Sequence, residues 1–351
     1  MPRVQGDLNA RRSAPGVKTA RVLIIGGGAI AEQLHLPAAV RLLGSERVLL
    51  AEPDTERRAR LVTRFDCQRH SSDYRELIDK ADFAVVATPP HLHATIAEDC
   101  LAAGVPVLCE KPLANSTHEC RAMIDAARRA GQLLGTCHQR RFFPNRAAVR
   151  ERILAGEFGD GMRIDISEGT PSDWPSRSGY AFRKELIPGG VLLNSGIHSL
   201  DFMLWCLGDP IDLEYRDDSI GGLESNAEVS VRFANGCRGH LRISRTCQLS
   251  NTITVTGPRA SIHMKIFQFD RLIDTDGRER LVRSADDSAM TNWAGLGVKQ
   301  LTDFIEAIPG SHPPRCDGEA GLRVIDLVER CYSVKRNRSL PKTAPVPGRM
   351  W

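Results

Sequence analysis

The chain has 351 residues, of which 42% are hydrophobic and 26% charged, and this composition is typical of a globular protein large enough for two domains. Its 47 basic residues nearly balance its 43 acidic ones, so we expect no nucleic-acid partner. No segment approaches the roughly 20 apolar residues of a membrane helix, so we expect no membrane partner.

The ten cysteines contain no C-x-x-C pair. A structural zinc site or a redox dithiol usually needs such a pair, so we expect no metal and predict buried, reduced thiols in a cytoplasmic protein. Arg11 and Arg12 are not followed by an apolar segment, which argues against an export signal. We interpret residues 1–20 as a flexible arm.

Short apolar runs alternate with amphipathic stretches over residues 21–140. This alternation predicts βαβ units and a doubly wound parallel sheet of Rossmann type. Strands are expected at 21–25, 48–51, 83–87 and 105–109, and helices at 29–43, 55–65, 91–103 and 116–130.

The pattern changes over residues 141–336, where strands follow one another with short turns. The Asn235-Gly236 pair is a strong signal for a hairpin turn. We therefore predict a C-terminal α/β domain with a large, mostly antiparallel open sheet, followed by a tail at 337–351. Strands are expected at 160–169, 227–233, 237–246, 253–256 and 261–266, and helices at 191–207, 298–308 and 318–334.

The motif G-x-G-x-x-A at Gly26, Gly28 and Ala31 lies between the first strand and the first helix. Gly26 permits a tight turn, Gly28 lets a pyrophosphate approach the backbone, and the helix N-terminus attracts the anion. Glu52 ends the second strand, where a carboxylate accepts hydrogen bonds from ribose hydroxyls and repels a 2'-phosphate. These features predict NAD as the cofactor, and NADP stays possible because Arg57 and Arg58 are close.

Two further loops follow buried strands, at 87–94 (ATPPHLHA) and 108–114 (LCEKPLA). The carboxyl ends of parallel strands open on the ligand site, so we expect these loops beside the nicotinamide. We expect His93 to lie at the start of the following helix or behind the site, and not to act as a catalyst. The predicted cofactor contacts are Gly26, Gly28, Ala29, Ile30, Glu52, Thr88, Pro89, Pro90, His93, Glu110 and Lys111.

The E-K-P segment at 110–112 and the segment GGVLLNSGIHSLD at 189–201, together with the glycine loop, resemble the Gfo/Idh/MocA oxidoreductases. This family is named for glucose-fructose oxidoreductase, inositol dehydrogenase and a rhizopine-catabolism protein. The resemblance runs from residue 21 to residue 334. It implies a Rossmann-type NAD(P) domain, a C-terminal sheet that forms a homo-oligomer (a dimer or tetramer), and oxidation or reduction of a secondary alcohol on a sugar or cyclitol.

By the same resemblance, Lys111 hydrogen-bonds the reacting oxygen and His198 acts as acid or base. The chemistry of the two side chains agrees with this implication. When a carbinol loses hydride its hydroxyl proton must also leave, and the pKa of histidine suits that transfer near neutral pH. A lysine ammonium group stabilises the developing alkoxide.

Asn194 lies four residues before His198, on the same face of the expected helix. The family commonly has aspartate there. An amide binds a sugar hydroxyl but cannot take its proton, which leaves His198 as the expected base and Asn194 as a substrate-binding residue, with Asp201 further along the same segment. This departure also keeps open a non-catalytic, NAD-sensing regulator.

The loop at 170–186 precedes this segment and contains aromatic and basic residues. Aromatic rings suit the apolar face of a sugar or a base, and arginines suit phosphate. We expect a nucleotide-activated or phosphorylated sugar, in bacterial secondary-metabolite (antibiotic) sugar biosynthesis; a cyclitol or aminocyclitol is the alternative substrate. Packing at an interface is another role for the aromatic residues. The predicted contacts here are Trp174, Arg177, Tyr180 and Arg183.

Overall fold

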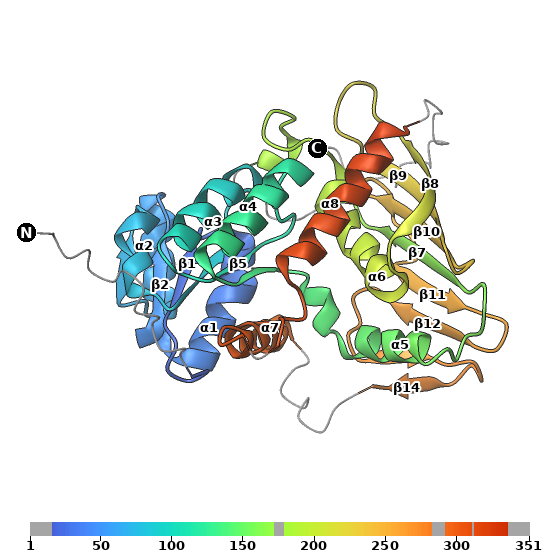
Figure 1. The fold of residues 1–351 in the computed structure, drawn as a ribbon, viewed down its shortest axis with the longest axis horizontal. Helices are drawn as coiled ribbons and strands as arrows, with labels where there is room; N and C mark the ends of the chain where they lie inside the picture. Colours follow the sequence, from blue (N-terminus) through green and yellow to red (C-terminus); the bar gives the residue numbers. More distant parts are fainter. Residues whose placement is uncertain (1–15, 172–178, 283–291, 311, 336–351) are drawn as a thin grey trace, which may run out of the picture.

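The computed structural model describes residues 16–171, 179–282, 292–310 and 312–335. Two sheets organise these residues, and helix α8 (Gly318–Ser333) lies between the two parts of the molecule (Figure 1). Trp174, Arg177, most of the predicted N-terminal arm and the predicted C-terminal tail lie outside the described residues.

The N-terminal sheet has six parallel strands in the order β3-β2-β1-β4-β5-β6, which confirms the predicted Rossmann-type sheet. All residues of β1, β2, β4 and β5 are buried, because helices cover both faces, and this explains their continuous apolar sequence. Strands β3 and β6 were not predicted, since each is three residues long and lacks an apolar run. The strands are β1 (Val22–Ile25), β2 (Val48–Ala51), β3 (Arg69–Ser71), β4 (Phe83–Val86), β5 (Val107–Cys109) and β6 (Leu134–Thr136).

The helices of this part begin close to the predicted residues. The helix predicted at 29–43 starts with a π-helical turn at Ala31–His35 before it becomes regular. Asp54 caps the helix at Thr55–Phe65, and Ser116 caps the helix at Thr117–Ala130. Each cap accepts a hydrogen bond from a first-turn backbone N–H. The α-helices are α1 (Leu36–Leu43), α2 (Thr55–Phe65), α3 (His93–Ala102) and α4 (Thr117–Ala130).

The second sheet has eight strands in the order β14-β13-β12-β11-β7-β10-β9-β8. Only the β7–β10 pair is parallel, so the prediction of a mostly antiparallel sheet is confirmed. The hairpin between β9 and β10 turns at Gly236, whose φ is +80°. The strands are β7 (Arg163–Gly169), β8 (Pro210–Asp217), β9 (Asn226–Phe233), β10 (Arg238–Ser244), β11 (Thr252–Thr256), β12 (Ser261–Lys265), β13 (Arg271–Ile273) and β14 (Glu279–Leu281).

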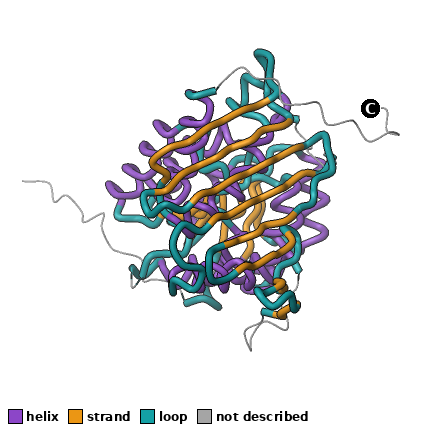
Figure 2. The backbone as a smooth tube through the Cα atoms, turned by 90° about the vertical axis from the view of Figure 1, so that its right-hand side faces the viewer, coloured by secondary structure: helices purple, strands orange, loops and turns teal. Residues whose placement is uncertain are grey.

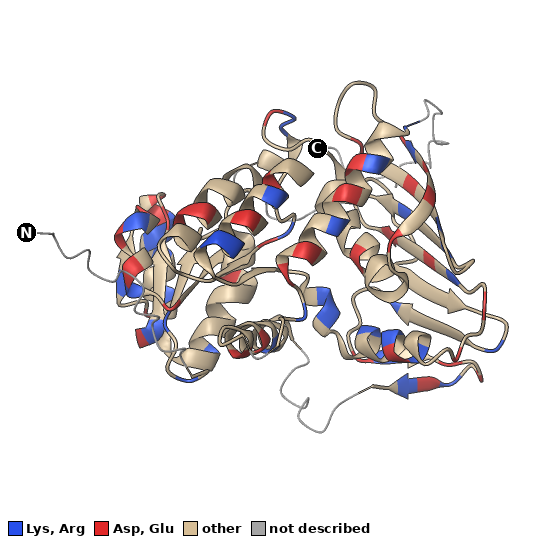
Figure 3. Ribbon diagram, in the orientation of Figure 1, with Lys and Arg blue, Asp and Glu red and all other residues tan. Residues whose placement is uncertain are grey.

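Helices cover the inner face of this sheet, and its outer face is open (Figure 2). Helices α5 (Pro144–Leu154) and α6 (Ile197–Leu207) lie on the inner side together with α8 (Figure 1). Strand β10 alternates accordingly, with Leu241 buried and its neighbours His240 and Arg242 partly exposed. Basic and acidic residues are both scattered over the strands and helices of the two parts (Figure 3). None of the described helices is long and apolar enough to cross a membrane.

Helix α7 (Trp293–Ala307) packs on the N-terminal sheet, although it comes late in the chain (Figure 1). Its Phe304 is buried, and the ring centroids of Phe304 and Phe83 lie 5.9 Å apart. The N-terminal core therefore extends beyond the predicted boundary at residue 140. A helical apolar pattern shows that a helix has a buried face but does not show which core that face joins.

We predict that Phe304→Ala lowers the free energy of unfolding by about 3–5 kcal/mol, because it leaves a cavity against a buried strand. Phe182→Ala is the matched control, since Phe182 is 64% exposed. Denaturant titration measures both changes. Equal effects of the two substitutions would contradict the assignment of α7 to this core.

Candidate active site

The glycine loop after β1 has the geometry of a dinucleotide turn. Gly26 has a φ of +96°, and a Cβ atom there would lie 2.8 Å from the carbonyl oxygen of Ala87, so only glycine fits. A Cβ on Gly28 would meet only that same oxygen, at 4.0 Å. The protein's own packing therefore does not require glycine at 28, whereas close approach of a ligand would. Ala29 and Ile30 follow, partly exposed, at the N-terminal end of the first helix.

Glu52 lies against this loop, as predicted, and it is 3% exposed. Its Oε2 accepts a hydrogen bond from the Gly27 backbone N–H at 2.7 Å. Its Oε1 accepts hydrogen bonds from the backbone N–H of Asp54 at 2.9 Å and from Nη1 of Arg57 at 3.1 Å. Protein donors thus already contact the carboxylate that was expected to bind the ribose, and Arg57 is a direct partner of Glu52.

Lys111 follows β5 and joins the two parts of the molecule. Its Nζ donates a hydrogen bond of 2.9 Å to the backbone carbonyl of Asn194, directly before α6. Burial lowers the pKa of Lys111, while the charge of Glu110 opposes that shift and the charge of Arg140 adds to it. The predicted pair of loops, at 108–114 and 189–201, therefore meets in space.

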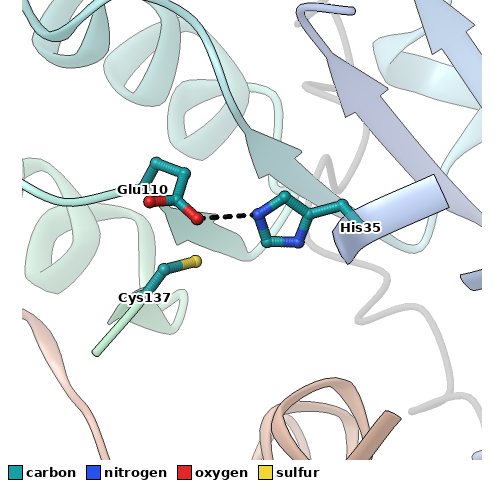
Figure 4. A group of neighbouring side chains, drawn as sticks. All are labelled: His35, Glu110 and Cys137. Atoms are coloured by element: carbon teal, nitrogen blue, oxygen red, sulfur yellow. Dashed lines mark hydrogen bonds and ion pairs between the residues drawn. The ribbon is translucent and has the colours of Figure 1, made fainter. Parts of the chain in front are cut away.

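Glu110 is buried behind Lys111 and holds the loop in place. Its Oε1 accepts a hydrogen bond of 2.8 Å from Nε2 of His35 (Figure 4). Its Oε2 accepts one of 3.0 Å from the backbone N–H of Lys111. Burial raises the pKa of Glu110, but the hydrogen bond with His35 and the charge of Lys111 outweigh it, so the net shift is downward. Glu110 is therefore an ionised positioning residue.

Cys137 completes a buried group with His35 and Glu110 (Figure 4), and their possible ligand atoms lie within 4.8 Å of one another. Among the described residues this is the group that could hold a metal ion. Burial raises the pKa of the Cys137 thiol well above its ordinary value. Because His35 and Glu110 already bind each other, we interpret the group as support for Lys111.

His93 has no exposed surface and connects the two nicotinamide-side loops. Its Nδ1 lies 2.9 Å from the carbonyl oxygen of Pro112, and its Nε2 lies 2.8 Å from that of Thr88. The prediction that His93 contacts the cofactor is not supported, because a fully buried ring cannot reach a ligand. Its burial fits the alternative position behind the site. Thr88 and Pro89 are partly exposed beside it, and Pro90 is buried.

The segment that carries His198 begins with a π-helical turn, Leu192–Gly196, which continues into α6. Glu224 anchors this turn, because its carboxylate accepts hydrogen bonds from the backbone N–H groups of Gly190 at 2.8 Å and Leu192 at 3.0 Å. Asn194 is partly exposed one turn before His198. The side chains of Asn194 and His198 therefore lie at successive turns of one helix face, as predicted.

His198 is 6% exposed, and its Nδ1 is buried without a hydrogen-bond partner. Burial lowers the pKa of His198 well below its ordinary value, and the charges of Arg140 and Lys111 lower it further. The ring is therefore neutral at neutral pH. A neutral imidazole can accept the proton of a substrate hydroxyl.

The sequence analysis missed Arg140 and Glu168, which lie close to His198. Nη2 of Arg140 donates to Oε1 of Glu168 at 2.8 Å, and the hydroxyl of Ser199 donates to Oε2 at 2.6 Å. Burial raises the pKa of Glu168, but Arg140 and Ser199 outweigh it and the net shift is downward. One signal was available: Glu168 occupies the buried face of β7 that Ile164 and Ile166 share, where a charge is unexpected.

Asp201 does not fit the predicted contact with the sugar. Its carboxylate accepts hydrogen bonds from Nε and Nη2 of Arg141, the latter at 2.6 Å, and it is 2% exposed. Burial raises the pKa of Asp201, but nearby His138 and Arg141 lower it overall. A carboxylate held in this way fixes α6 against the segment at 139–142 and is not available to a ligand.

Of the described residues predicted in the substrate loop, Tyr180 is partly buried against the core. Burial raises the pKa of Tyr180 to about 12, and the charge of Glu110 contributes. Arg183 is exposed and forms an ion pair of 2.8 Å with Glu185. Lys184 donates a hydrogen bond to the carbonyl of Gly221. The described basic residues of this loop therefore have protein partners.

Family models match most of this arrangement. The model described as an oxidoreductase family with an NAD-binding Rossmann fold covers residues 20–138, and the GFO/IDH/MocA C-terminal domain covers residues 147–263. The chain belongs to the Gfo/Idh/MocA oxidoreductase family. It is an NAD-dependent enzyme with an NAD-binding Rossmann domain, as the resemblance implied.

Three curated relatives resemble this chain in sequence. The 1,5-anhydro-D-fructose reductase of Ensifer adhaerens is 28% identical over 309 residues, which are 85% of this chain and 91% of the relative. The levoglucosan dehydrogenase of Pseudarthrobacter phenanthrenivorans is 29% identical over 64% of this chain and 65% of the relative. The inositol 2-dehydrogenase of Rubrobacter xylanophilus is 30% identical over 54% and 51%, respectively.

Solved structures share the fold. A levoglucosan dehydrogenase in complex with NADH and levoglucosan has a TM-score of 0.78 at 23% identity, covering 90% of this chain and 98% of that one. An aldose-aldose oxidoreductase from Caulobacter crescentus also has a TM-score of 0.78, at 21% identity, covering 90% and 97%. Both therefore combine a parallel sheet with a large mixed sheet in the same way.

We predict that the unaltered protein has a lower Kd for NADH than for NADPH. Glu52→Ala should reduce the ratio of these two Kd values by about tenfold or more. The substitution removes the repulsion of a 2'-phosphate and releases Arg57 to bind it. Arg57→Ala is the counterpart and should widen the difference. Fluorescence titration with both cofactors measures this, and tighter NADPH binding by the unaltered protein would contradict the role of Glu52.

Proposed function

We propose that the chain oxidises a secondary alcohol on a single-ring sugar or reduces the corresponding ketone, with Lys111 and His198 as the catalytic residues. The observation that carries this proposal is the hydrogen bond between Lys111 and the Asn194 carbonyl, at the start of the helix that bears His198. It brings an ammonium group from one part of the chain beside an imidazole from the other. NAD supplies the hydride acceptor in oxidation, bound by the glycine loop and the loops after β4 and β5.

In the oxidative direction the neutral ring of His198 takes the hydroxyl proton. The carbinol carbon loses hydride, and the O–H electron pair becomes the second bond of the carbonyl group. The ammonium group of Lys111 hydrogen-bonds the same oxygen and stabilises its negative charge as the proton leaves. Asn194 holds a neighbouring hydroxyl, because its amide can donate and accept but cannot take a proton.

The proposed substrate class rests on the relatives and on the loop at 170–186, whose described basic residues bind other groups of the protein. The relatives are named for 1,5-anhydro-D-fructose, levoglucosan and inositol, which supports a compact ring. The expectation of a nucleotide or phosphorylated sugar rested partly on Arg183, which pairs with Glu185, and on Trp174 and Arg177. We therefore keep phosphate recognition out of the proposal. A cyclitol is the second candidate, favoured by the similarity to an inositol dehydrogenase.

We also propose a homo-oligomer, a dimer or tetramer, through the outer face of the large sheet, which no helix covers. That face bears residues such as Arg242 and Glu228, whose charged groups lie 3.7 Å apart, so the contact would be polar. Light scattering during gel filtration tests this proposal. A monomer at micromolar concentration would contradict it.

His198→Ala should lower kcat by about 10²- to 10⁴-fold, the usual loss when a positioned acid or base is removed. His240→Ala is the matched control, because His240 lies on the outer face of the sheet and bonds Ser230. Turnover is measured by NADH absorbance with single-ring sugars and cyclitols. Near-full activity of the His198 variant would contradict the assignment, and a protein that binds NADH but turns over no substrate would favour the regulator.

Lys111→Ala should also depress turnover while NADH still binds, because the glycine loop remains intact. Since Lys111 and His198 act on one oxygen, the double variant should lose less activity than the two single losses combined. Asn194→Asp should remain active. If the activity loss of the double variant equals the product of the two single losses, the two residues do not act on the same atom.

A further inference from the structure

Two arginines beside His198 have buried nitrogens without acceptors. Arg146 on α5 is 2% exposed, and both its Nη1 and Nη2 lack a hydrogen-bond partner. Nη1 of Arg140, which is 8% exposed, also lacks one. Buried polar groups are nearly always hydrogen-bonded, and arginine carries only donors, so these nitrogens need acceptors.

Among the described residues around Arg146, none supplies such an acceptor. Its guanidinium carbon lies 5.5 Å from the ring centroid of Phe143 and 5.3 Å from that of Phe202. Glu168 and Asp201 act on Arg146 through charge, but their hydrogen bonds go to Arg140, Ser199 and Arg141. Two aromatic rings therefore flank the guanidinium group, whose Nη1 and Nη2 donors have no acceptor among the described residues.

The charges in this group do not balance. Glu168 compensates one of the two cations, Arg140, with which it forms an ion pair of 2.8 Å. Asp201 is bound to Arg141, and the charge of Glu110 balances that of the neighbouring Lys111. One positive charge, that of Arg146, is therefore left without an ionic partner. Burial and Arg140 lower the pKa of Arg146 to about 9, which is the cost of an uncompensated buried cation.

This group is next to the reacting centre. Phe202, which contacts Arg146, lies one turn after His198 on the same face of α6. The charges of Arg140 and Arg146 both act on the His198 ring. Arg140 lies on the more exposed side of this group of residues, because its guanidinium packs over Phe267, whose side chain is 52% exposed.

We propose that Arg140 and Arg146 bind a carboxylate on the substrate, so that the chain acts on an acidic sugar. The inference rests on the proposed function and narrows its substrate class. A carboxylate matches the group in three respects: it accepts hydrogen bonds only, it suits the planar fork of a guanidinium, and its single negative charge equals the uncompensated charge. Asn194 fits the same conclusion, because an amide adds no negative charge that would repel an anion.

The carboxylate is unchanged in the reaction and serves to place the ring. Bound at the arginines, it fixes the distance of the reacting hydroxyl from His198. That hydroxyl gives its proton to His198, and its carbon gives hydride to NAD⁺, so the products are a keto acid sugar, NADH and a protonated histidine that releases its proton to solvent.

The test compares sugars that differ only in the acidic group, using D-glucuronate, D-galacturonate, their amides and the parent aldoses. We expect kcat/KM with NAD⁺ to be at least tenfold higher for an acid than for its amide. Arg146→Met should lower kcat/KM for the acid by about 10- to 100-fold relative to kcat/KM for its amide, so that the preference for the acid is lost. The ratio of the two values is the readout, because the lost charge also acts on His198 and so affects both substrates alike. Arg150→Met is the matched control, because Arg150 lies one turn further along α5 and bonds the carbonyl of Trp205.

A binding measurement keeps the inference separate from the proposed function. Sodium acetate should raise the unfolding temperature of the unaltered protein above its value in sodium chloride at equal ionic strength, and should not do so in the Arg146→Met variant. That variant should fold, because replacing an unpaired buried charge with an apolar side chain is neutral or stabilising. If it does not fold, Arg146→Gln takes its place in both assays.

The outcomes distinguish the two claims. Equal turnover of acids and amides would overturn the carboxylate site and leave sugar oxidation intact. Acetate protection with no turnover of any sugar would overturn the proposed function and support the arginine site. Protection by chloride equal to that by acetate would assign the arginines to a free inorganic anion and overturn the inference.

Discussion

The hydrogen bond from Lys111 to the Asn194 carbonyl is the contact on which the candidate site depends. Lys111 follows a strand of the parallel sheet, and Asn194 precedes the helix that packs on the mixed sheet. Neither part contains both proposed catalytic groups, so the proposed reaction requires their relative position to be fixed. Helix α8, between α4 and α6, and helix α7, on the N-terminal core, reinforce that position because the late chain packs against both parts (Figure 1).

Buried carboxylates and their hydrogen-bond donors support the proposed catalytic side chains from behind. Glu110 with His35, Asp201 with Arg141, and Glu168 with Arg140 each place a carboxylate against a donor in a region with little exposure. Removing one partner of such a pair typically costs about 3–5 kcal/mol, because the other charge is left buried and unpaired. These pairs therefore orient the loop and the helix, and burial, together with the positive charges near His198, keeps its ring neutral.

Much of the fold could be predicted because its signals are local. The apolar runs at 22–25, 48–51 and 83–86 are strands buried on both faces, and Gly236 marks the expected hairpin. Short strands such as β3 and β6 were missed because three residues show no periodicity. The placement of α7 could not be predicted, because it depends on which core accepts its apolar face.

The candidate site was predicted in part for a similar reason. Lys111 and His198 occur in recognisable segments, whereas Arg140 and Glu168 matter only through contacts between segments distant in sequence. Glu52 was expected at the glycine loop, and its bond with Arg57 depends on side-chain conformations that spacing does not determine. Asp201 and His93 were assigned to ligands although their full burial commits them to protein partners, and burial of a polar residue on a helix is not visible in the sequence.

The central claim is that His198 is neutral and can take a proton at the pH of catalysis. The direct measurement is a ¹⁵N NMR titration of the histidine ring nitrogens, with His198→Gln used to assign the resonance. Because burial and the neighbouring positive charges lower the pKa of His198, its ring should stay neutral as the pH falls from 8 through the ordinary histidine value of about 6.5. Protonation of His198 at or above that value would contradict the account.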